Sequence, residues 1–219
     1  MLLTVNHPRG CSRETLIDAC WPGKAPEKSL HSLQVEISSL RRLLHGMVGA
    51  VFSPENLIIC RDHNYSLNPR LCIRRDIVQF EKSAHEAMAS ESVDRERCKQ
   101  LGDHALKLYR GDFCEEISDD WCENMRAYYR EMSFALLKKL AKCAFDDGDT
   151  GKALSLYGNA NRLDPYDEAL HLGIMRCMAR LKDHDGVQQQ YRALTKVLKD
   201  LKIAAPCREA TAIYEESLG

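Results

Sequence analysis

Four residues spaced by three or four positions could contact the edges of nucleic-acid bases. His31, Val35, Ser38 and Arg42 recur at the period of one helical face, with Ser39 beside them. An arginine can donate two hydrogen bonds to guanine, a histidine or serine can reach a base edge or a phosphate, and a valine can pack on the methyl group of thymine. The alternative interpretation is an ordinary solvated helix surface.

The stretch that must position these residues runs from Ala25 to Gly46 and is predicted to be a long helix. Its opposite face repeats apolar residues at spacings of three and four, which predicts that this face is buried. The members of this face are Leu30, Leu33, Ile37, Leu40 and Leu44. Arg41 lies on the flank, where we expect it to contact a phosphate or form a surface ion pair. A helix with an apolar back and a basic, hydroxyl-bearing front can lie in a DNA major groove.

The elements around this helix predict a winged helix. Residues 1–7 are predicted to form one or two helical turns, and Ser12 is predicted to cap a second helix that Pro22 and Gly23 end. After the long helix, residues 56–60 and 65–67 are two β-rich runs around a polar turn, which is typical of a hairpin. Arg61 and His63 lie at its tip, where a wing would meet the DNA backbone or minor groove. The alternative for the tip is an ordinary polar turn.

From residue 76 onwards the pattern is helical, and its last hundred residues contain a repeat. Shifting this part by 34 positions superposes residues of the same kind, and 34 residues is the period of tetratricopeptide helix pairs. The pairs are Leu136 with Leu170, Leu140 with Ile174, Ala144 with Met178, Asp149 with Asp183, Ala153 with Val187, Tyr157 with Tyr191, and Leu163 with Val197. Each such unit must stack on a neighbour to bury its apolar face. Residues 209–218 are predicted to form a terminal helix that caps the stack.

Charge is distributed unevenly along the 219 residues. Residues 1–75 hold ten Lys or Arg and six acidic residues, a net charge of +4, and the remainder carries −5. This asymmetry favours two modules, with any polyanion held by the first. The sequence contains no apolar run of about 18 residues and no signal peptide, so we expect a cytoplasmic protein without a membrane segment.

The ten cysteines contain no C-x-x-C pair. Most fall on predicted apolar faces, as Cys20, Cys143 and Cys177 do, which favours small buried thiols in a reducing compartment over disulfides. A zinc corner of His7, Cys11 and Cys20 lacks a second paired set of ligands. There is also no phosphate-binding loop, no nucleophile elbow and no pair of catalytic carboxylates. We therefore expect no metal, no cofactor and no enzymatic activity.

Taken in order, these motifs resemble a known family of bacterial regulators. The first 70 residues are similar to the DNA-contacting part of the OmpR-type winged helix, and residues 76–218 resemble the bacterial transcriptional activator domain that follows it in the antibiotic regulatory proteins. The matching motifs are residues 7–10, 12–22, 35–42, 108–113, 148–149, 153–154, 163–165 and 213–218, with Trp121, His171, Met175 and Tyr191.

The resemblance implies a mostly α-helical chain of two domains. Residues 1–72 would form a truncated winged helix-turn-helix with a C-terminal β-hairpin wing, and residues 76–219 an α-helical domain of TPR-like repeats. It implies a transcriptional activator that binds double-stranded DNA, with RNA polymerase and a second copy of the chain as candidate protein partners. The alternative function is a helical-repeat scaffold for protein–protein interaction whose residual winged helix does not bind DNA.

Two features depart from the family pattern. The chain begins at the first helix of the winged helix, without the antiparallel sheet that normally opens the fold. We therefore expect either a piece of a longer protein or a trimmed variant. In addition, Ser39 stands where relatives often have a basic residue, and Glu36 is an acid that they rarely have there.

Overall fold

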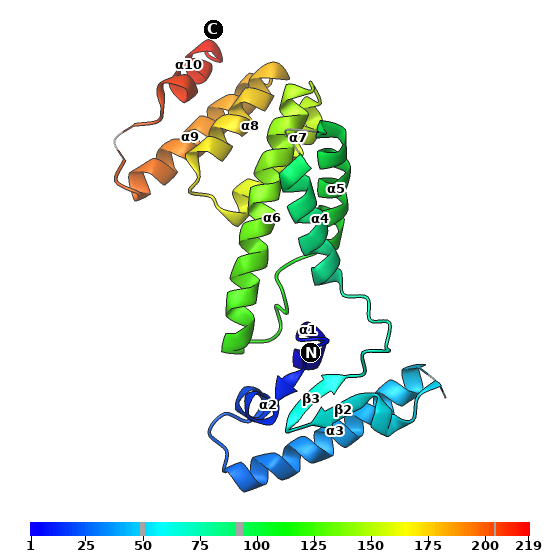
Figure 1. The fold of residues 1–219 in the computed structure, drawn as a ribbon. Coiled ribbons are helices and arrows are strands. Elements are labelled where there is room, and N and C mark those ends of the chain that lie inside the picture. Colours follow the sequence, from blue (N-terminus) through cyan, green and yellow to red (C-terminus); the bar gives the residue numbers. More distant parts are fainter. Residues whose placement is uncertain (49–50, 91–93, 204) are drawn as a thin grey trace. The chain divides into compact units, whose positions relative to one another are not determined.

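The computed structural model describes residues 1–48, 51–90, 94–203 and 205–219. It divides into two compact units, Met1–Arg75 and Asp76–Gly219 (Figure 1). Helices dominate the described residues, and a small antiparallel sheet lies in the first unit. The predicted fold class, a mostly α-helical chain with a hairpin wing and helical repeats, is confirmed.

The described residues of the first unit form three α-helices and a small sheet that ends in a β-hairpin. Its elements are α1 (Leu2–Val5), β1 (Cys11–Ser12), α2 (Arg13–Cys20), α3 (Pro26–Val48), the 3₁₀-helix η2 (Pro54–Asn56), β2 (Ile58–Arg61) and β3 (Asn64–Leu67). The strands are antiparallel in the order β1-β3-β2. Because β1 pairs with β3, the hairpin of β2 and β3 is hydrogen-bonded to the segment that immediately precedes α2.

Local sequence signals account for α2 and for the hairpin. The Ser12 hydroxyl accepts a hydrogen bond from the Thr15 backbone N–H at 3.0 Å, which is the predicted N-cap. Arg61 pairs with Asn64 across the hairpin, so only Asp62 and His63 form the turn. Both have positive φ angles, 47° and 63°, as a two-residue hairpin turn that matches strand twist requires.

The apolar back of α3 forms the core of the first unit together with the sheet. Leu33 and Ile37 are buried and belong to the same cluster as Ile58, Tyr65 and Leu67. Burial of such aliphatic side chains contributes about 1.5–3 kcal/mol each relative to leaving them exposed. This packing fixes which side of α3 faces outward.

The predicted burial of Leu40 is wrong. Its side chain is 41% exposed, and Leu30 and Leu44 are only half-buried. At this level of α3 it is Arg41 that reaches the sheet, where it donates to the Ile58 carbonyl. Successive residues of a helix are rotated by about 100°, so Leu40 is turned away from the sheet.

The second unit consists of stacked helices. They are α4 (Asp76–Ser90), α5 (Arg95–Leu108), α6 (Asp120–Asp146), α7 (Thr150–Leu163), α8 (Glu168–Arg180), α9 (His184–Asp200) and α10 (Arg208–Glu216). Both α4 and α5 pack on α6, and from α6 to α9 each helix packs on the next (Figure 1). The terminal helix α10 packs on α8 and α9 and completes a second apolar cluster, as expected for a capping helix.

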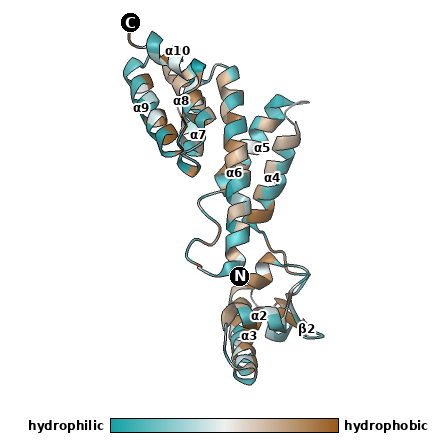
Figure 2. Cartoon of the chain, turned by 90° about the vertical axis from the view of Figure 1, so that its left-hand side faces the viewer, coloured by the Kyte–Doolittle hydropathy of each residue, from teal (hydrophilic) through white to brown (hydrophobic). Residues whose placement is uncertain are grey.

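The 34-residue repeat is present in the structure. Leu140 and Ile174, which it pairs, are 2% and 5% exposed at equivalent positions of α6 and α8. Asp149 and Asp183 both cap the next helix by accepting a hydrogen bond from the backbone N–H three residues later. Hydrophobic and hydrophilic residues alternate along the helices in Figure 2, as expected for helices with one buried face.

The turns that follow α6 and α8 each contain a residue in the left-handed conformation, and in the second turn this residue is not a glycine. Gly148, at the end of α6, has φ = 85°, and its repeat partner Lys182, after α8, has φ = 60°. A non-glycine residue in this left-handed conformation is strained, and glycine relieves the strain. We expect Lys182→Gly to raise the free energy of unfolding by about 0.5–1 kcal/mol, and Gly148→Ala to lower it by a similar amount. Urea unfolding of both variants checks this, and a Lys182→Gly variant that is less stable than the wild type would contradict it.

The cysteines are less uniformly buried than expected. None of the ten, all of which lie among the described residues, is in a disulfide, and those at 11, 98, 122, 143 and 177 are buried. The expected burial of Cys20 is wrong, because it lies exposed at the end of α2, and Cys60 and Cys72 are exposed as well. None of the described helices has both the length and the apolar composition that crossing a membrane requires.

Candidate nucleic-acid interface

The outward face of α3 carries the residues singled out from the sequence. His31, Val35, Ser38 and Arg42 are all exposed, and Val35 is 49% exposed although it is apolar. Ser39 is half-buried, and its hydroxyl accepts a hydrogen bond from Arg42 Nη2 at 3.4 Å. Because Leu33 and Ile37 hold the opposite side of α3 in the core, the first four side chains project from one accessible helix face.

Arg41 occupies a different position from these residues. Its Nε and Nη2 both donate to the Ile58 carbonyl oxygen, at 3.1 and 2.6 Å. This contact ties α3 to the first residue of β2. The structure therefore places the Arg41 guanidinium against the sheet, where it fixes the orientation of α3 relative to the hairpin.

Removing this contact is expected to destabilise the first unit. Arg41→Met keeps the apolar stem but leaves the Ile58 carbonyl without its charged donor, so the free energy of unfolding should fall by about 1–2 kcal/mol. Arg42→Met is the matched control, because Arg42 is exposed and its loss should change stability by less than about 0.5 kcal/mol. Trp21 lies in the first unit and Trp121 in the second, so Trp21 fluorescence in a Trp121→Phe background reports on the first unit. Equal unfolding midpoints for the two variants would contradict the assigned role of Arg41.

The hairpin tip brings further basic residues together. Arg61 and His63 are exposed, as expected for a wing tip. The His63 carbonyl accepts a hydrogen bond from the Arg13 backbone N–H at 2.8 Å, and Arg13 Nη1 lies 3.5 Å from His63 Nδ1. The Asn64 side-chain amide donates to the Arg9 carbonyl at 2.8 Å. Arg9 and Arg13 therefore lie beside the wing, although their sequence positions are about 50 residues away.

Sequence reasoning missed Arg9 and Arg13 because β1 has no periodic signal. The strand is only Cys11–Ser12, too short for alternation to be recognised. Arg13 is also partly engaged with Glu14, at 3.1 Å. The backbone N–H of Glu14 and then the Arg13 guanidinium hold the pKa of the Glu14 carboxyl below its usual value, so this acid is ionised and offsets part of the local positive charge.

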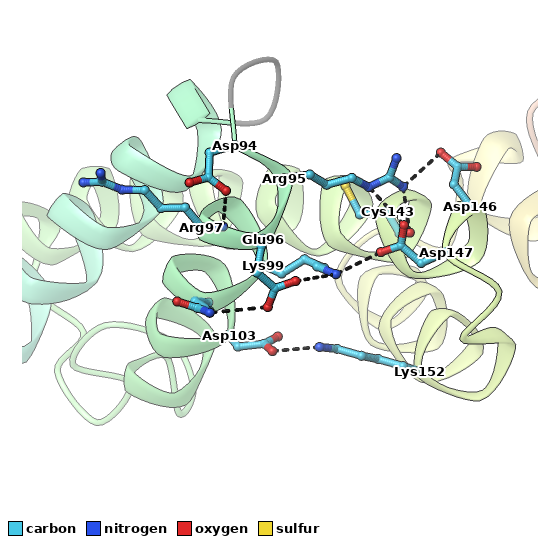
Figure 3. A network of polar contacts seen from close by, with 11 residues as sticks. Asp94, Arg95, Glu96, Arg97, Lys99, Asp103, Cys143, Asp146, Asp147 and Lys152 are labelled. Atoms are coloured by element: carbon cyan, nitrogen blue, oxygen red, sulfur yellow. Dashed lines mark hydrogen bonds and ion pairs between the residues drawn. The ribbon is translucent and has the colours of Figure 1, made fainter.

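A second cluster of charged side chains lies in the helical unit, where α5 meets the end of α6 and the start of α7 (Figure 3). Lys99 contacts Glu96 at 2.8 Å and Asp147 at 3.1 Å, and Arg95 contacts Asp147 at 3.2 Å. Hydrogen bonds, first of all that with Glu96, raise the pKa of Lys99, and the Lys99 hydrogen bond lowers the pKa of Glu96. The cluster borders a cavity of about 200 Å³.

The ion pairs of this cluster join α5 to α6 and α7. Lys152 of α7 contacts Asp103 of α5 at 2.7 Å, and Arg95 of α5 also reaches Asp146 at the end of α6 at 3.5 Å. Each of these carboxylates is engaged by a cationic side chain from a neighbouring helix. Among the described residues, no three His, Cys, Asp or Glu side chains are grouped as a metal ion would need.

Comparisons with known proteins agree with this architecture. The chain is similar in fold to the solved structure described as Mycobacterium tuberculosis EmbR in complex with low affinity phosphopeptide, with a TM-score of 0.73 and 20% sequence identity. The similarity covers 99% of this chain and 57% of EmbR, so this chain spans little more than half the length of that structure. No curated protein matched the chain.

The model of the bacterial transcriptional activator domain matches residues 75–216, nearly the whole helical unit. The chain therefore belongs to the bacterial transcriptional activator domain family, a family of transcription regulators.

Proposed function

We propose that the chain is a DNA-binding transcriptional activator in which α3 reads a promoter through the major groove. The observation that carries this proposal is the outward face of α3, where His31, Val35, Ser38 and Arg42 are exposed on a helix whose other side is locked into the core. In helix-turn-helix proteins the second helix of the motif enters the major groove. The net charge of +4 on residues 1–75 favours approach to a polyanion.

The wing would contribute contacts to the DNA backbone. Arg61 and His63 are exposed at its tip, and Arg9 and Arg13 lie beside them. Cationic side chains in such a position hold phosphates and set the register of the protein on the duplex. Arg41 and Ser39 would act mainly through their contacts with Ile58 and Arg42, and less by direct contact with DNA.

The helical unit would convert DNA binding into activation by contacting other proteins. Stacked helix pairs create extended surfaces suited to protein binding. We propose RNA polymerase or a second copy of the chain as the partner, and the bacterial cytoplasm, where promoter DNA is found, as its location.

A second candidate function is a protein-interaction scaffold in which the winged helix binds no DNA. The observation that favours it is a row of exposed apolar side chains near the end of α3. Leu40, Leu43 and Met47 are 41%, 66% and 81% exposed, which suits a protein contact better than a DNA contact.

Selection from a random duplex library with the full chain separates the two functions. The DNA-binding proposal expects an enriched sequence that binds at least about 10³-fold more tightly than its scrambled version at physiological salt. A chain that enriches no sequence and binds all duplexes equally weakly would contradict this proposal and favour the scaffold function.

A further inference from the structure

We propose that Cys114 and Cys122 form an oxidisable thiol pair that closes into a disulfide when the protein meets a hydroperoxide. Cys114 lies in the connection between α5 and α6, and Cys122 lies in the first turn of α6. Their side chains are hydrogen-bonded to one another. Cys114 is half-buried, so a small oxidant can reach it, whereas Cys122 is fully buried.

Arg126 of α6 holds the backbone of the connection that carries Cys114. Arg126 donates to the carbonyl oxygens of Phe113, Cys114 and Ile117, at 3.1, 2.9 and 2.7 Å. The Arg126 side chain is largely buried, at 15% exposure, so water competes little for these hydrogen bonds. They hold the Cys114 backbone against Arg126, which lies one helical turn after Cys122 on α6.

The same guanidinium lies close enough to favour the thiolates. Burial has the largest influence on both thiols and raises the pKa of each. The neighbouring Cys122 raises the pKa of Cys114 further, the hydrogen bond from Cys114 lowers that of Cys122, and the positive charge of Arg126 opposes the rise at both. The pair is therefore mostly protonated at neutral pH, and a thiolate forms transiently. This behaviour suits a pair that stays reduced in a reducing compartment and reacts under oxidant stress.

The reaction balances with the hydroperoxide as the oxidant. The Cys114 thiolate attacks one peroxide oxygen, the O–O bond breaks, and Cys114 becomes a sulfenic acid while the other oxygen leaves as an alcohol or water. The Cys122 thiolate then attacks the Cys114 sulfur, the S–S bond forms and the sulfenic oxygen leaves as water. The two thiols lose two electrons and two protons in total, and the peroxide gains them.

Trypsin digestion offers a direct test, because cleavage after Arg110 and Arg126 yields a peptide with Cys114 and Cys122 as its cysteines. The full chain is treated with hydrogen peroxide, alkylated and digested. We expect the peptide of residues 111–126 to become lighter by two hydrogen atoms and to resist alkylation until dithiothreitol is added. The exposed Cys20, Cys60 and Cys72 serve as internal references for ordinary thiol oxidation. Unlinked thiols in this peptide, after these references have reacted, would overturn the proposal.

Thermal unfolding provides an independent readout. A disulfide that closes a loop of this length restricts the unfolded chain and should raise the Tm of the oxidised protein by about 5 °C. Cys114→Ser and Cys122→Ala should both abolish this peroxide-dependent rise, and Cys60→Ser should retain it. An oxidised wild type with a lowered Tm would contradict the proposed geometry, because the linkage would then form only in a distorted chain. These outcomes do not depend on whether the protein binds DNA.

Discussion

Leu140→Ala is expected to lower the free energy of unfolding of the helical unit by about 2–5 kcal/mol. Leu140 lies on α6, is 2% exposed and belongs to the main apolar cluster of this unit. Its side chain fills the space left by Gly102 on α5, since a Cβ atom added there would lie 2.7 Å from Leu140 Cδ1. Truncation would remove these dispersion contacts and leave a cavity between α5 and α6.

Four further variants make this prediction specific to the repeat. Ile174→Ala, at the equivalent position of α8, should also cost about 2–5 kcal/mol, whereas Leu181→Ala should change stability by less than about 0.5 kcal/mol because Leu181 is 51% exposed. Gly102→Ala should destabilise the wild type but partly restore Leu140→Ala, because its methyl group would enter the vacated space. Urea midpoints measure all four. An unchanged midpoint for both Leu140→Ala and Ile174→Ala would show that the 34-residue register is wrong.

Arg42→Ala is expected to weaken binding to the selected DNA site by about 1–3 kcal/mol, or about 5–150-fold. Within the four-residue face of α3, Arg42 has a permanent charge and a planar fork of donors, so it should contribute most. If its guanidinium clasps a guanine, the loss is largest on the selected site and the base preference relaxes at one position. If it contacts a phosphate, all sequences lose affinity alike and the slope of log K against log salt falls by about one.

Two controls separate these contributions. Val35→Ala should cause a smaller, sequence-dependent loss without a change in salt slope, because a methyl contact releases no counterions. Lys196→Ala removes one positive charge from an exposed position on α9 in the other unit and should leave DNA affinity unchanged. Fluorescence anisotropy on selected and scrambled duplexes over a range of salt concentrations measures these effects. Unchanged affinity in folded Arg42→Ala and Val35→Ala would mean that this face of α3 does not enter the groove.

Much of the fold could be predicted because its signals are local. Ser12, Asp149 and Asp183 each cap the helix that follows, and a cap needs only a hydrogen bond to a nearby backbone N–H. The 34-residue spacing of Leu140 and Ile174 likewise repeats one helix-pair geometry, so their burial follows from periodicity. The exposure of His31, Val35, Ser38 and Arg42 follows from the same kind of pattern.

Other features were decided only when distant segments met. Leu40 and Arg41 are adjacent, and which of them faces the sheet depends on the Ile58 carbonyl, 17 positions after Arg41. Arg13 joins the wing through β1, and Lys99 pairs with Asp147, 48 positions away. Periodicity describes one element at a time, whereas these hydrogen bonds and ion pairs depend on how two elements pack. The sequence thus determined the helices and their apolar faces, and the tertiary structure decided which polar groups they bring together.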